Sequence, residues 1–438
     1  MIKNNTNIIE KQVGIKTFLT KTDGINGKLR LEPEDFTVEE IPDELKENNQ
    51  GKFVIAKVTA INWETNLLVR ELSNRLKISR KRISFAGTKD KRAKTTQTMS
   101  FYNISKQELS EIKIKDVEIT NINISEKPIK LGDLKGNIFE INIRNIEPKN
   151  HKEKIKKITD LIKKNKGFPN FYGIQRFGTI RPITHIVGKN IIKGDFKSAV
   201  MCYIANPFKE ENESIYKLRK ELEETKDYAN ALKNYPNYLI YEKSILNKLV
   251  EKPDDYISAL KELPNTLLTM FIHAYQSYLF NEILSKRIIK EISINKAIKG
   301  DIIFPIKNNK IQKNTIKVNK YNIEKVNKQI EKRKAVVTAL LFGSKSKLTD
   351  GLMGEIERDV LKKEKIDKRN FIVPEIPFIS SYGTRRPIIA YINEIKYHIK
   401  EDTKNKNIDL NLRFQLSKGC YATSLLREYM KSDDITNY

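Results

Sequence analysis

The stretch FAGTKDKRAKTTQ, from Phe85 to Gln97, runs from an apolar strand end into a lysine-rich turn that carries one carboxylate, Asp90. Three cations flank this carboxylate: Lys89, Lys91 and Arg92. Nearby cations favour the ionised form of a carboxylate, and an ionised Asp can act as a nucleophile or a base. The same letters are typical of a solvated polar turn, because Asp suits turn geometry. The local sequence favours the solvated turn, so a role for Asp90 needs support from elsewhere in the chain.

The composition predicts a polyanionic partner. The chain has 82 Lys and Arg against 55 Asp and Glu, which gives a formal net charge of +27 and a pI of about 9.6. The excess is spread along the chain, which fits a folded basic surface better than a disordered arm. A lysine-rich surface produced by codon bias would give the same balance, so the charge alone does not identify the partner.

The length of 438 residues allows two or three domains with their own cores. No run of eighteen or more apolar residues occurs, and the N-terminal MIKNNTNIIEKQ lacks the apolar stretch of a signal peptide. We therefore expect a soluble, cytoplasmic protein that does not enter a membrane. Cys202 and Cys420 form no CxxC pair and the four histidines are isolated from one another, which argues against a disulfide framework and a metal site.

Apolar periodicity predicts strands and helices together in about the first 165 residues. The segments that read as strands include Leu31 to Ile41, Phe53 to Ala60, Thr98 to Tyr102, Val117 to Ile124 and Gly136 to Arg144. The last of these, GNIFEINIR, alternates apolar and polar residues, as in an antiparallel sheet with one solvated face. A helix with leucines at every fourth position is expected to start at a cap of Thr65 or Asn66. This part of the chain is therefore predicted to be α+β.

After residue 180 the pattern becomes mainly helical. Two long amphipathic helices are predicted, Leu267 to Ile289 and Tyr321 to Leu341. Strands are predicted again near the C-terminus: Ile388 to Ile392, Ile395 to Ile399 and Leu412 to Leu416. This order is expected of a helical domain inserted into a sheet domain.

Common nucleotide-binding and hydrolase motifs are missing from the sequence. A P-loop needs GxxxxGK[ST], and neither GTKDKRAKT nor FGSKSKLTDG supplies the second glycine next to the lysine. No GxGxxG follows a strand, and no GxSxG nucleophile elbow occurs.

A second informative stretch, PNFYGIQRFG, spans Pro169 to Gly178 and combines aromatic rings with an amide and a guanidinium. Rings stack on an unpaired base while Asn or Gln reads its edge, so the pattern suits single-stranded RNA or an extruded base. Asn170 and Tyr172 are the best candidates for these roles. An aromatic-rich packed turn explains the same letters equally well.

With three further blocks, these two stretches resemble the tRNA pseudouridine synthase D family in an archaeal-type form. The further blocks are LEPEDFTVEEI (Leu31 to Ile41), AYQSYLFNEILSKR (Ala274 to Arg287) and LRFQLSKGCYATSLLREYM (Leu412 to Met430). All five occur in the family's order, and the resemblance covers the chain from about Gly27 onward.

The resemblance implies an α+β pseudouridine synthase catalytic domain with a mixed, largely antiparallel sheet, and an inserted, mainly helical TRUD domain. We place the catalytic domain at residues 1–179 and 379–438 and the inserted domain at 180–378. The implied activity is that of an isomerase that converts uridine to pseudouridine in tRNA, at position thirteen as in bacterial members. We expect the protein to bind tRNA and to act as a monomer.

The resemblance assigns the chemistry to two residues. The Asp of the family's AGxKDK-like block falls on Asp90, and the basic residue before the EDF block, commonly Lys, is Arg30 here. Arg30 would hold Asp90 through a charge-assisted hydrogen bond. The reaction detaches uracil at N1, turns it and rejoins it through C5, so we expect no metal or other cofactor. Whether Asp90 attacks the sugar or base covalently or removes a sugar proton stays open.

The resemblance assigns substrate binding to four residues: Phe36, Asn170, Tyr172 and Tyr421. At the last two positions the family commonly has Phe, and the exchange to Tyr keeps a ring that can stack on a base. Two other classes of protein are compatible with parts of the sequence: a non-catalytic RNA-binding protein that kept the fold, and an interaction protein whose charge reflects codon bias. The presence of Asp90 argues against the first, and its occurrence together with the other blocks argues against the second.

Overall fold

The computed structural model describes residues 6–43, 51–308, 310–402 and 407–434, which divide into two compact units. The first unit contains residues 20–168 and the described chain from 390 onward; the second contains the segment before residue 20 and residues 169–389. The chain leaves the first unit within β7 (Gly167–Pro169) and returns to it within β13 (Ile389–Tyr391). The predicted insertion, 180–378, falls inside the second unit.

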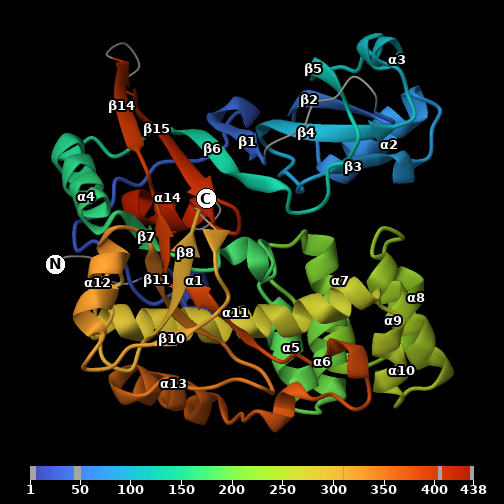
Figure 1. Cartoon of the computed structure of the whole chain (residues 1–438). Coiled ribbons are helices and arrows are strands. Elements are labelled where there is room, and N and C mark those ends of the chain that lie inside the picture. The colour runs from blue at the N-terminus through green and yellow to red at the C-terminus, as the bar shows by residue number, and fades with distance from the viewer. Residues whose placement is uncertain (1–5, 44–50, 309, 403–406, 435–438) are drawn as a thin grey trace. The chain divides into compact units, whose positions relative to one another are not determined.

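A sheet organises the first unit, and its described strands lie in the order β14-β15-β6-β1-β4-β2-β5, with β3 pairing to β4 (Figure 1). These strands are β1 (Phe36–Pro42), β2 (Phe53–Ile61), β3 (Ile83–Phe85), β4 (Lys94–Tyr102), β5 (Val117–Ser125), β6 (Leu134–Ile143), β14 (Ile395–Asp402) and β15 (Asn407–Ser417). Strands β1 and β4 run parallel, while the other described pairs are antiparallel. The prediction of a mixed, largely antiparallel sheet in an α+β protein is confirmed.

Helices cover this sheet through two apolar clusters. Helices α4 (His151–Asn165) and α14 (Ala422–Met430) pack against β6 and β15, and α2 (Thr65–Arg75) packs against β2 and β4. The alternating residues Phe139, Ile141 and Ile143 of β6 face this core, as their spacing predicts. Each such side chain contributes roughly 1.5–3 kcal/mol on burial. Shorter elements complete the unit: η1 (Pro33–Asp35), η2 (Arg80–Arg82) and α3 (Lys106–Ser110).

The predicted cap of α2 is wrong by one residue. Glu64 caps the helix, because its carboxylate accepts hydrogen bonds from the backbone N–H groups of Asn66 and Leu67. The hydroxyl of Thr65 instead accepts the backbone N–H of Lys89 at 2.7 Å. Thr65 therefore ties α2 to the turn that carries Asp90.

Helix α11 (Asn265–Ile289) is the centre of the second unit and confirms the helix predicted there (Figure 1). It packs against α5 (Thr184–Ile192) and α13 (Gly351–Glu364). Gly188 of α5 lies so close to α11 that a Cβ there would be 2.0 Å from the carbonyl oxygen of Phe271, so only glycine allows this approach. The remaining helices of the unit are α1 (Ile8–Gln12), η3 (Ile174–Arg176), α6 (Phe196–Ile204), α7 (Glu213–Thr225), α8 (Tyr228–Asn234), α9 (Ile240–Glu251), α10 (Tyr256–Lys261), α12 (Ile323–Glu331), η4 (Arg369–Phe371) and η5 (Pro377–Ile379).

A second sheet corrects the prediction of one helix over Tyr321 to Leu341. Helix α12 ends at Glu331, Arg333 takes a left-handed backbone with φ 55°, and the chain continues as β11 (Ala335–Leu341). Nearly all of β11 is buried, and a continuous apolar run does not distinguish a buried strand from a buried helix. The sheet has the order β10-β8-β11-β12, with β9 pairing to β8. Its other strands are β8 (Ile302–Lys307), β9 (Lys310–Ile311), β10 (Ile316–Lys317) and β12 (Thr384–Pro387).

The three predicted C-terminal strands are found: two inside β14 and β15, and the first, shortened, as β13. None of the helices in the described parts of the chain combines the length and the apolar character needed to cross a bilayer.

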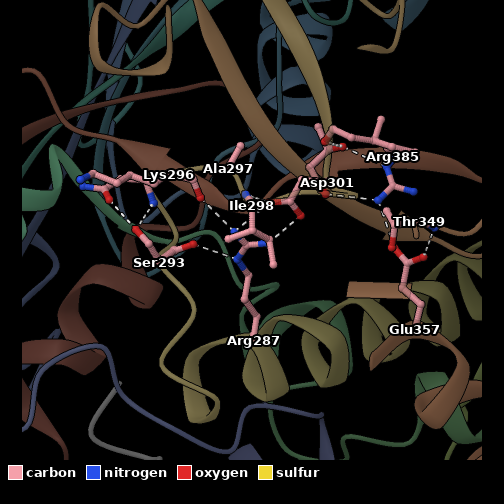
Figure 2. A network of polar contacts seen from close by, with 12 residues as sticks. Arg287, Ser293, Lys296, Ala297, Ile298, Asp301, Thr349, Glu357 and Arg385 are labelled. Carbon is pink, nitrogen blue, oxygen red and sulfur yellow. Dashed lines mark hydrogen bonds and ion pairs between the residues drawn. The ribbon is translucent and has the colours of Figure 1, made fainter. Parts of the chain in front are cut away.

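Buried ion pairs tie α11 and α13 of the second unit to its strands and loops (Figure 2). Arg287 of α11 binds both carboxylate oxygens of Asp301 at 2.8 and 3.0 Å and also donates to the carbonyl oxygens of Ser293 and Lys296. Both charged side chains are at most 1% exposed. The good geometry compensates for the loss of water around the two charges, so removing one partner leaves the other without compensation.

We predict that Arg287→Met lowers the free energy of unfolding by about 3–5 kcal/mol, because the carboxylate of Asp301 stays buried without its partner. The neighbouring Lys286→Met is a matched control, since its ion pair with Asp359 is 3.7 Å long and largely exposed; we expect a loss below about 1 kcal/mol. Urea unfolding at pH 7 measures both values. Equal losses in the two variants would contradict the buried pair as a main source of stability.

His185 of α5 is kept neutral inside the second unit. Its Nε2 lies 3.1 Å from the carbonyl oxygen of Gln12, its ring stacks on Tyr278, and burial lowers its pKa to about 4. The unfolded chain binds the proton from about pH 6.5 downward, whereas the folded protein binds it only near pH 4. The contribution of neutral His185 to the free energy of unfolding is therefore fully present above pH 6.5. It is lost as the pH falls toward 4.

We predict that His185→Gln loses less stability than the wild-type protein between pH 7.5 and 5. The difference should be about 2 kcal/mol, which follows from the two pKa values by proton linkage. Urea unfolding at the two pH values gives the comparison, because other titrating groups contribute equally to both proteins. Identical losses in the two proteins would show that His185 titrates normally when folded.

Candidate active site

The parallel pairing of β1 and β4 builds the candidate site in the first unit. Its register sets Thr37 beside Lys94. Parallel strands begin at the same edge of a sheet, so the segment before β1 and the turn before β4 emerge close together. These segments carry Arg30 and Asp90, which are 60 residues apart in the chain.

Arg30 lies between an aromatic ring and a carboxylate. Its Nη2 donates to Oδ2 of Asp90 at 2.8 Å, and its guanidinium carbon is 4.1 Å from the centre of the Phe36 ring. The Arg30 side chain is 17% exposed, whereas that of Asp90 is 59% exposed. Among the described residues, Oδ1 of Asp90 has no hydrogen-bond partner. The arrangement thus fixes one carboxylate oxygen and leaves the other open to a ligand.

The backbone of Arg30 is left-handed, with φ 58°, a conformation that costs a residue with a side chain about 1–2 kcal/mol. The preceding residues hold it there. Lys28 forms a β-bridge with Arg144 at the end of β6, and Leu29 is buried in the core. Nε of Arg30 is buried without a partner in the described chain. The contacts of Lys28 and Leu29 therefore hold Arg30 in this strained backbone conformation.

A buried network that the sequence reasoning missed holds Phe36 in place. Asp35 is fully buried and accepts hydrogen bonds from Arg144 (Nε, 2.7 Å) and from the backbone N–H of Glu32. Arg144 also binds Asp409 at 2.7 Å, and its hydrogen bonds to both carboxylates raise its pKa. The only signal in the sequence was the position of Asp35 beside Phe36 in the EDF block.

Lys89 does not serve Asp90, contrary to the expectation that the flanking lysines keep this carboxylate ionised. Its Nζ lies 2.6 Å from Oε2 of Glu40, and the two side chains are 7% and 1% exposed. The buried carboxylate of Glu40 binds the side chain of Lys89, and this ion pair holds the turn against the sheet. Lys91 and Arg92 are exposed, and neither forms an ion pair with another described residue.

A second group of predicted residues lies together in the second unit. Oδ1 of Asn170 accepts Nη2 of Arg386 at 2.8 Å, and the guanidinium carbon of Arg386 is 4.1 Å from the centre of the Tyr172 ring. Asn170 also donates to the carbonyl oxygen of Pro387 at 3.0 Å. Asn170 is 4% exposed and both ends of its amide are occupied, so it holds Arg386 rather than presenting a free edge.

Asn281 of α11, also missed from the sequence, fixes the backbone at Tyr172. Its Oδ1 accepts the Tyr172 N–H at 2.9 Å, and its Nδ2 donates to the Tyr172 carbonyl oxygen at 3.0 Å. The Tyr172 ring also meets Phe280 edge to face at 5.6 Å. The block AYQSYLFNEILSKR contains both α11 residues, but spacing alone does not reveal that Asn281 binds a residue 109 positions away.

Tyr421 belongs to the first unit, where it is the half-buried residue before α14. The end of β15 lies level with the end of β1, since Ser417 and Ile41 both pair with Gly136. Strand register alone therefore does not bring Tyr421 to the Phe36 end of β1. No group of three or more His, Cys, Asp and Glu side chains suited to a metal occurs among the described residues.

Comparison with known proteins identifies the family. The profile of the family described as tRNA pseudouridine synthase D (TruD) matches residues 12–429. The chain belongs to this family. It is 43% identical over 437 residues to a protein of Methanococcoides burtonii named "Probable tRNA pseudouridine synthase D", with 99% of each chain covered. A protein of Archaeoglobus fulgidus with the same name is 39% identical, with 97% of this chain and 100% of its own length covered.

A solved structure agrees. The crystal structure reported for a tRNA pseudouridine synthase D from Methanosarcina mazei superposes with a TM-score of 0.89 at 41% identity, and covers 99% of this chain and 100% of its own. Members of the TruD family are isomerases that form pseudouridine in tRNA, so this chain is a tRNA pseudouridine synthase.

The different surroundings of Lys89 and Lys91 predict different effects of the same substitution. Lys89→Met should lower the free energy of unfolding by about 3–5 kcal/mol, because Glu40 stays buried without its partner. Lys91→Met should change stability by less than about 0.5 kcal/mol, yet weaken RNA binding and make it less salt-dependent. Urea unfolding and fluorescence anisotropy with tRNA at several KCl concentrations separate the two effects. Equal free energies of unfolding in both variants would contradict the conclusion that the buried Lys89–Glu40 pair stabilises the fold.

Proposed function

We propose that this TruD enzyme converts uridine 13 of tRNA to pseudouridine, with Asp90 as the catalytic carboxylate. The observation that carries the proposal is the position of Arg30, which is fixed by Phe36 on one side and binds a single oxygen of Asp90 on the other. Position thirteen comes from the resemblance to bacterial members. We further propose that the protein acts as a monomer, in the cytoplasm where its substrate tRNA is found.

Asp90 is suited to act on an extruded nucleotide. An exposed ion pair adds less than about 1 kcal/mol to stability. The contact with Arg30 therefore matters mainly because it positions the carboxylate of Asp90 and places a positive charge beside it. In the reaction the N1–C1′ bond breaks, a C5–C1′ bond forms, C5 loses its proton and N1 gains one. Oδ1 of Asp90 would either attack the sugar or base or remove the C2′ proton of the sugar. Deuterium at C2′ would slow only the second route.

Phe36 would contribute mainly through Arg30. The Phe36 ring is only 3% exposed, and the guanidinium covers it. Arginine planes stack on unpaired bases as aromatic rings do, so the free face of the guanidinium can receive the uracil. A direct contact between Phe36 and the base would require Arg30 to move first.

Tyr172, Asn170 and Tyr421 complete the proposed substrate contacts. We propose that Tyr172 stacks on RNA, with Arg386 supporting its ring, and that Asn170 acts by holding Arg386. Tyr421 is assigned by resemblance alone. Exposed basic residues near the catalytic turn, among them Lys91 and Arg92, would bind tRNA phosphates without reading sequence.

We predict that Asp90→Asn releases tritium from tRNA labelled at uracil C5 at least about a thousandfold more slowly than wild type, because a neutral amide is neither nucleophile nor base. Stability should change by less than about 1 kcal/mol. Asp160→Asn is a matched control, since Asp160 is 60% exposed and pairs with Lys156 at 3.3 Å in the same unit; its activity should stay at the wild-type level.

Two outcomes would contradict the proposal. Full label release by Asp90→Asn would exclude the aspartate as the catalytic group. Release from a tRNA in which only uridine 13 is replaced by cytidine would show that the enzyme modifies another position.

A further inference from the structure

A cavity of about 340 Å³ opens beside Tyr172 within the second unit. Its walls come from the Tyr172 segment, from α11 and from the loop that leads into β12, and the side chains that matter here are Tyr172, Arg176, His273, Gln276, Ser277 and Tyr382. The volume lies at the lower end of the range of about 300–1,000 Å³ that is usual for small-ligand pockets. It suits a single nucleotide-sized group.

An exposed aromatic ring forms one wall. Tyr382 is 65% exposed, although a tyrosine ring usually gains from burial, and the ammonium of Lys345 lies 4.0 Å from the centre of this ring. Tyr172 lines the same cavity, with one ring face supported by Arg386. Aromatic rings presented in this way stack on unpaired bases of any identity.

The side-chain amide of Gln276 lines the cavity in a fixed orientation. The side-chain nitrogen of Gln276 donates to the carbonyl oxygen of Phe342 at 2.6 Å and to the hydroxyl of Ser381 at 2.8 Å. The carbonyl partner determines the orientation of the amide, because only the nitrogen can donate to it. Oε1 of Gln276 has no partner among the described residues, yet it is not enclosed by protein. It is therefore an open acceptor for an N–H group of a ligand.

The charge at the cavity suits a phosphate-bearing ligand. Arg176 donates only through Nε, to Ser277 at 3.4 Å, so both its Nη atoms lack a partner within the described residues. His273 is neutral near pH 7, because burial and the charge of Arg176 lower its pKa. No carboxylate lines the cavity among the described residues. A guanidinium with free donors binds phosphate oxygens in pairs.

Hydrogen bonds and close packing hold the segments that adjoin the cavity. Arg385 of β12 is anchored by Glu357 at 3.1 Å (Figure 2). The hydroxyl of Thr338 also accepts a hydrogen bond from Nε of Arg385 at 2.9 Å. Successive residues of a strand point to opposite faces, so anchoring Arg385 also fixes Arg386, which supports Tyr172. Close backbone contact between Gly343 and Gly383 holds the loop before β12. The site is therefore preformed, as small-ligand sites usually are.

We infer that this cavity binds a second, unpaired nucleotide of the RNA, separate from the target uridine. The inference rests on the proposed function, which assigns Tyr172 to the RNA. The base stacks on Tyr382, an N–H of its edge donates to Oε1 of Gln276, and its phosphate meets Arg176. A base with an N–H donor is required, and the contact adds affinity for an RNA in which this base is unpaired.

The test is a double-mutant cycle between protein and RNA. Tritium release is measured with wild type and Tyr382→Ala, on RNAs that carry a single abasic residue, placed in turn at each unpaired position other than the target. We expect Tyr382→Ala to lower kcat/KM about tenfold on intact RNA, mainly through KM, as loss of one stacked base does. One abasic position should cause a similar loss in wild type and no further loss in the variant.

Tyr321→Ala provides the control. Tyr321 is 85% exposed in the same unit, and Lys320 lies 4.9 Å from its ring centre, but it does not line the cavity. Additive losses at every tested position, or equal effects of Tyr382→Ala and Tyr321→Ala, would overturn the inference. The proposed function stays intact in that case, provided that the wild-type protein releases the label. Absence of label release by wild type from any tRNA would instead contradict the proposed function.

Discussion

One parallel strand pair in a largely antiparallel sheet sets the geometry of the catalytic unit. An antiparallel neighbour of β1 would begin at the opposite edge of the sheet, and the turn that carries Asp90 would then lie a full strand length from Arg30. The pairing of β1 with β4 brings the two segments to one edge. The chain reaches this arrangement through β2, α2 and β3, so the long excursion between residues 42 and 94 is what makes the site possible.

At this edge the two ion pairs of the turn that carries Asp90 differ in burial. Lys89 and Glu40 are both enclosed and hold the turn to the sheet, while Asp90 stays mostly exposed with one oxygen unoccupied. Consecutive residues of one loop thus divide structure and chemistry between them. The second unit repeats this division in β12, where Arg385 is anchored inside and Arg386 supports Tyr172.

Sequence reasoning succeeded where one physical signal dominates. The alternation in GNIFEINIR identified β6, and the apolar stripe of Leu267 to Ile289 identified α11. It was wrong at Tyr321 to Leu341, because the buried run of β11 carries no alternation and the break at Arg333 involves no Gly or Pro. At the site, motifs pointed to Arg30, Phe36 and Asp90. Motifs did not reveal Asp35, Glu40 or Asn281, since these act through partners that only tertiary structure supplies.

The left-handed backbone at Arg30 has a consequence for how this protein can change. Glycine adopts φ 58° without strain, so replacement of Arg30 by glycine would relieve the backbone and at the same time remove the guanidinium that faces Asp90. Under the proposed mechanism, folding and catalysis therefore favour different residues at this position. Selection for stability alone would favour glycine there, whereas the proposed role requires a basic side chain, Arg here and commonly Lys in the family.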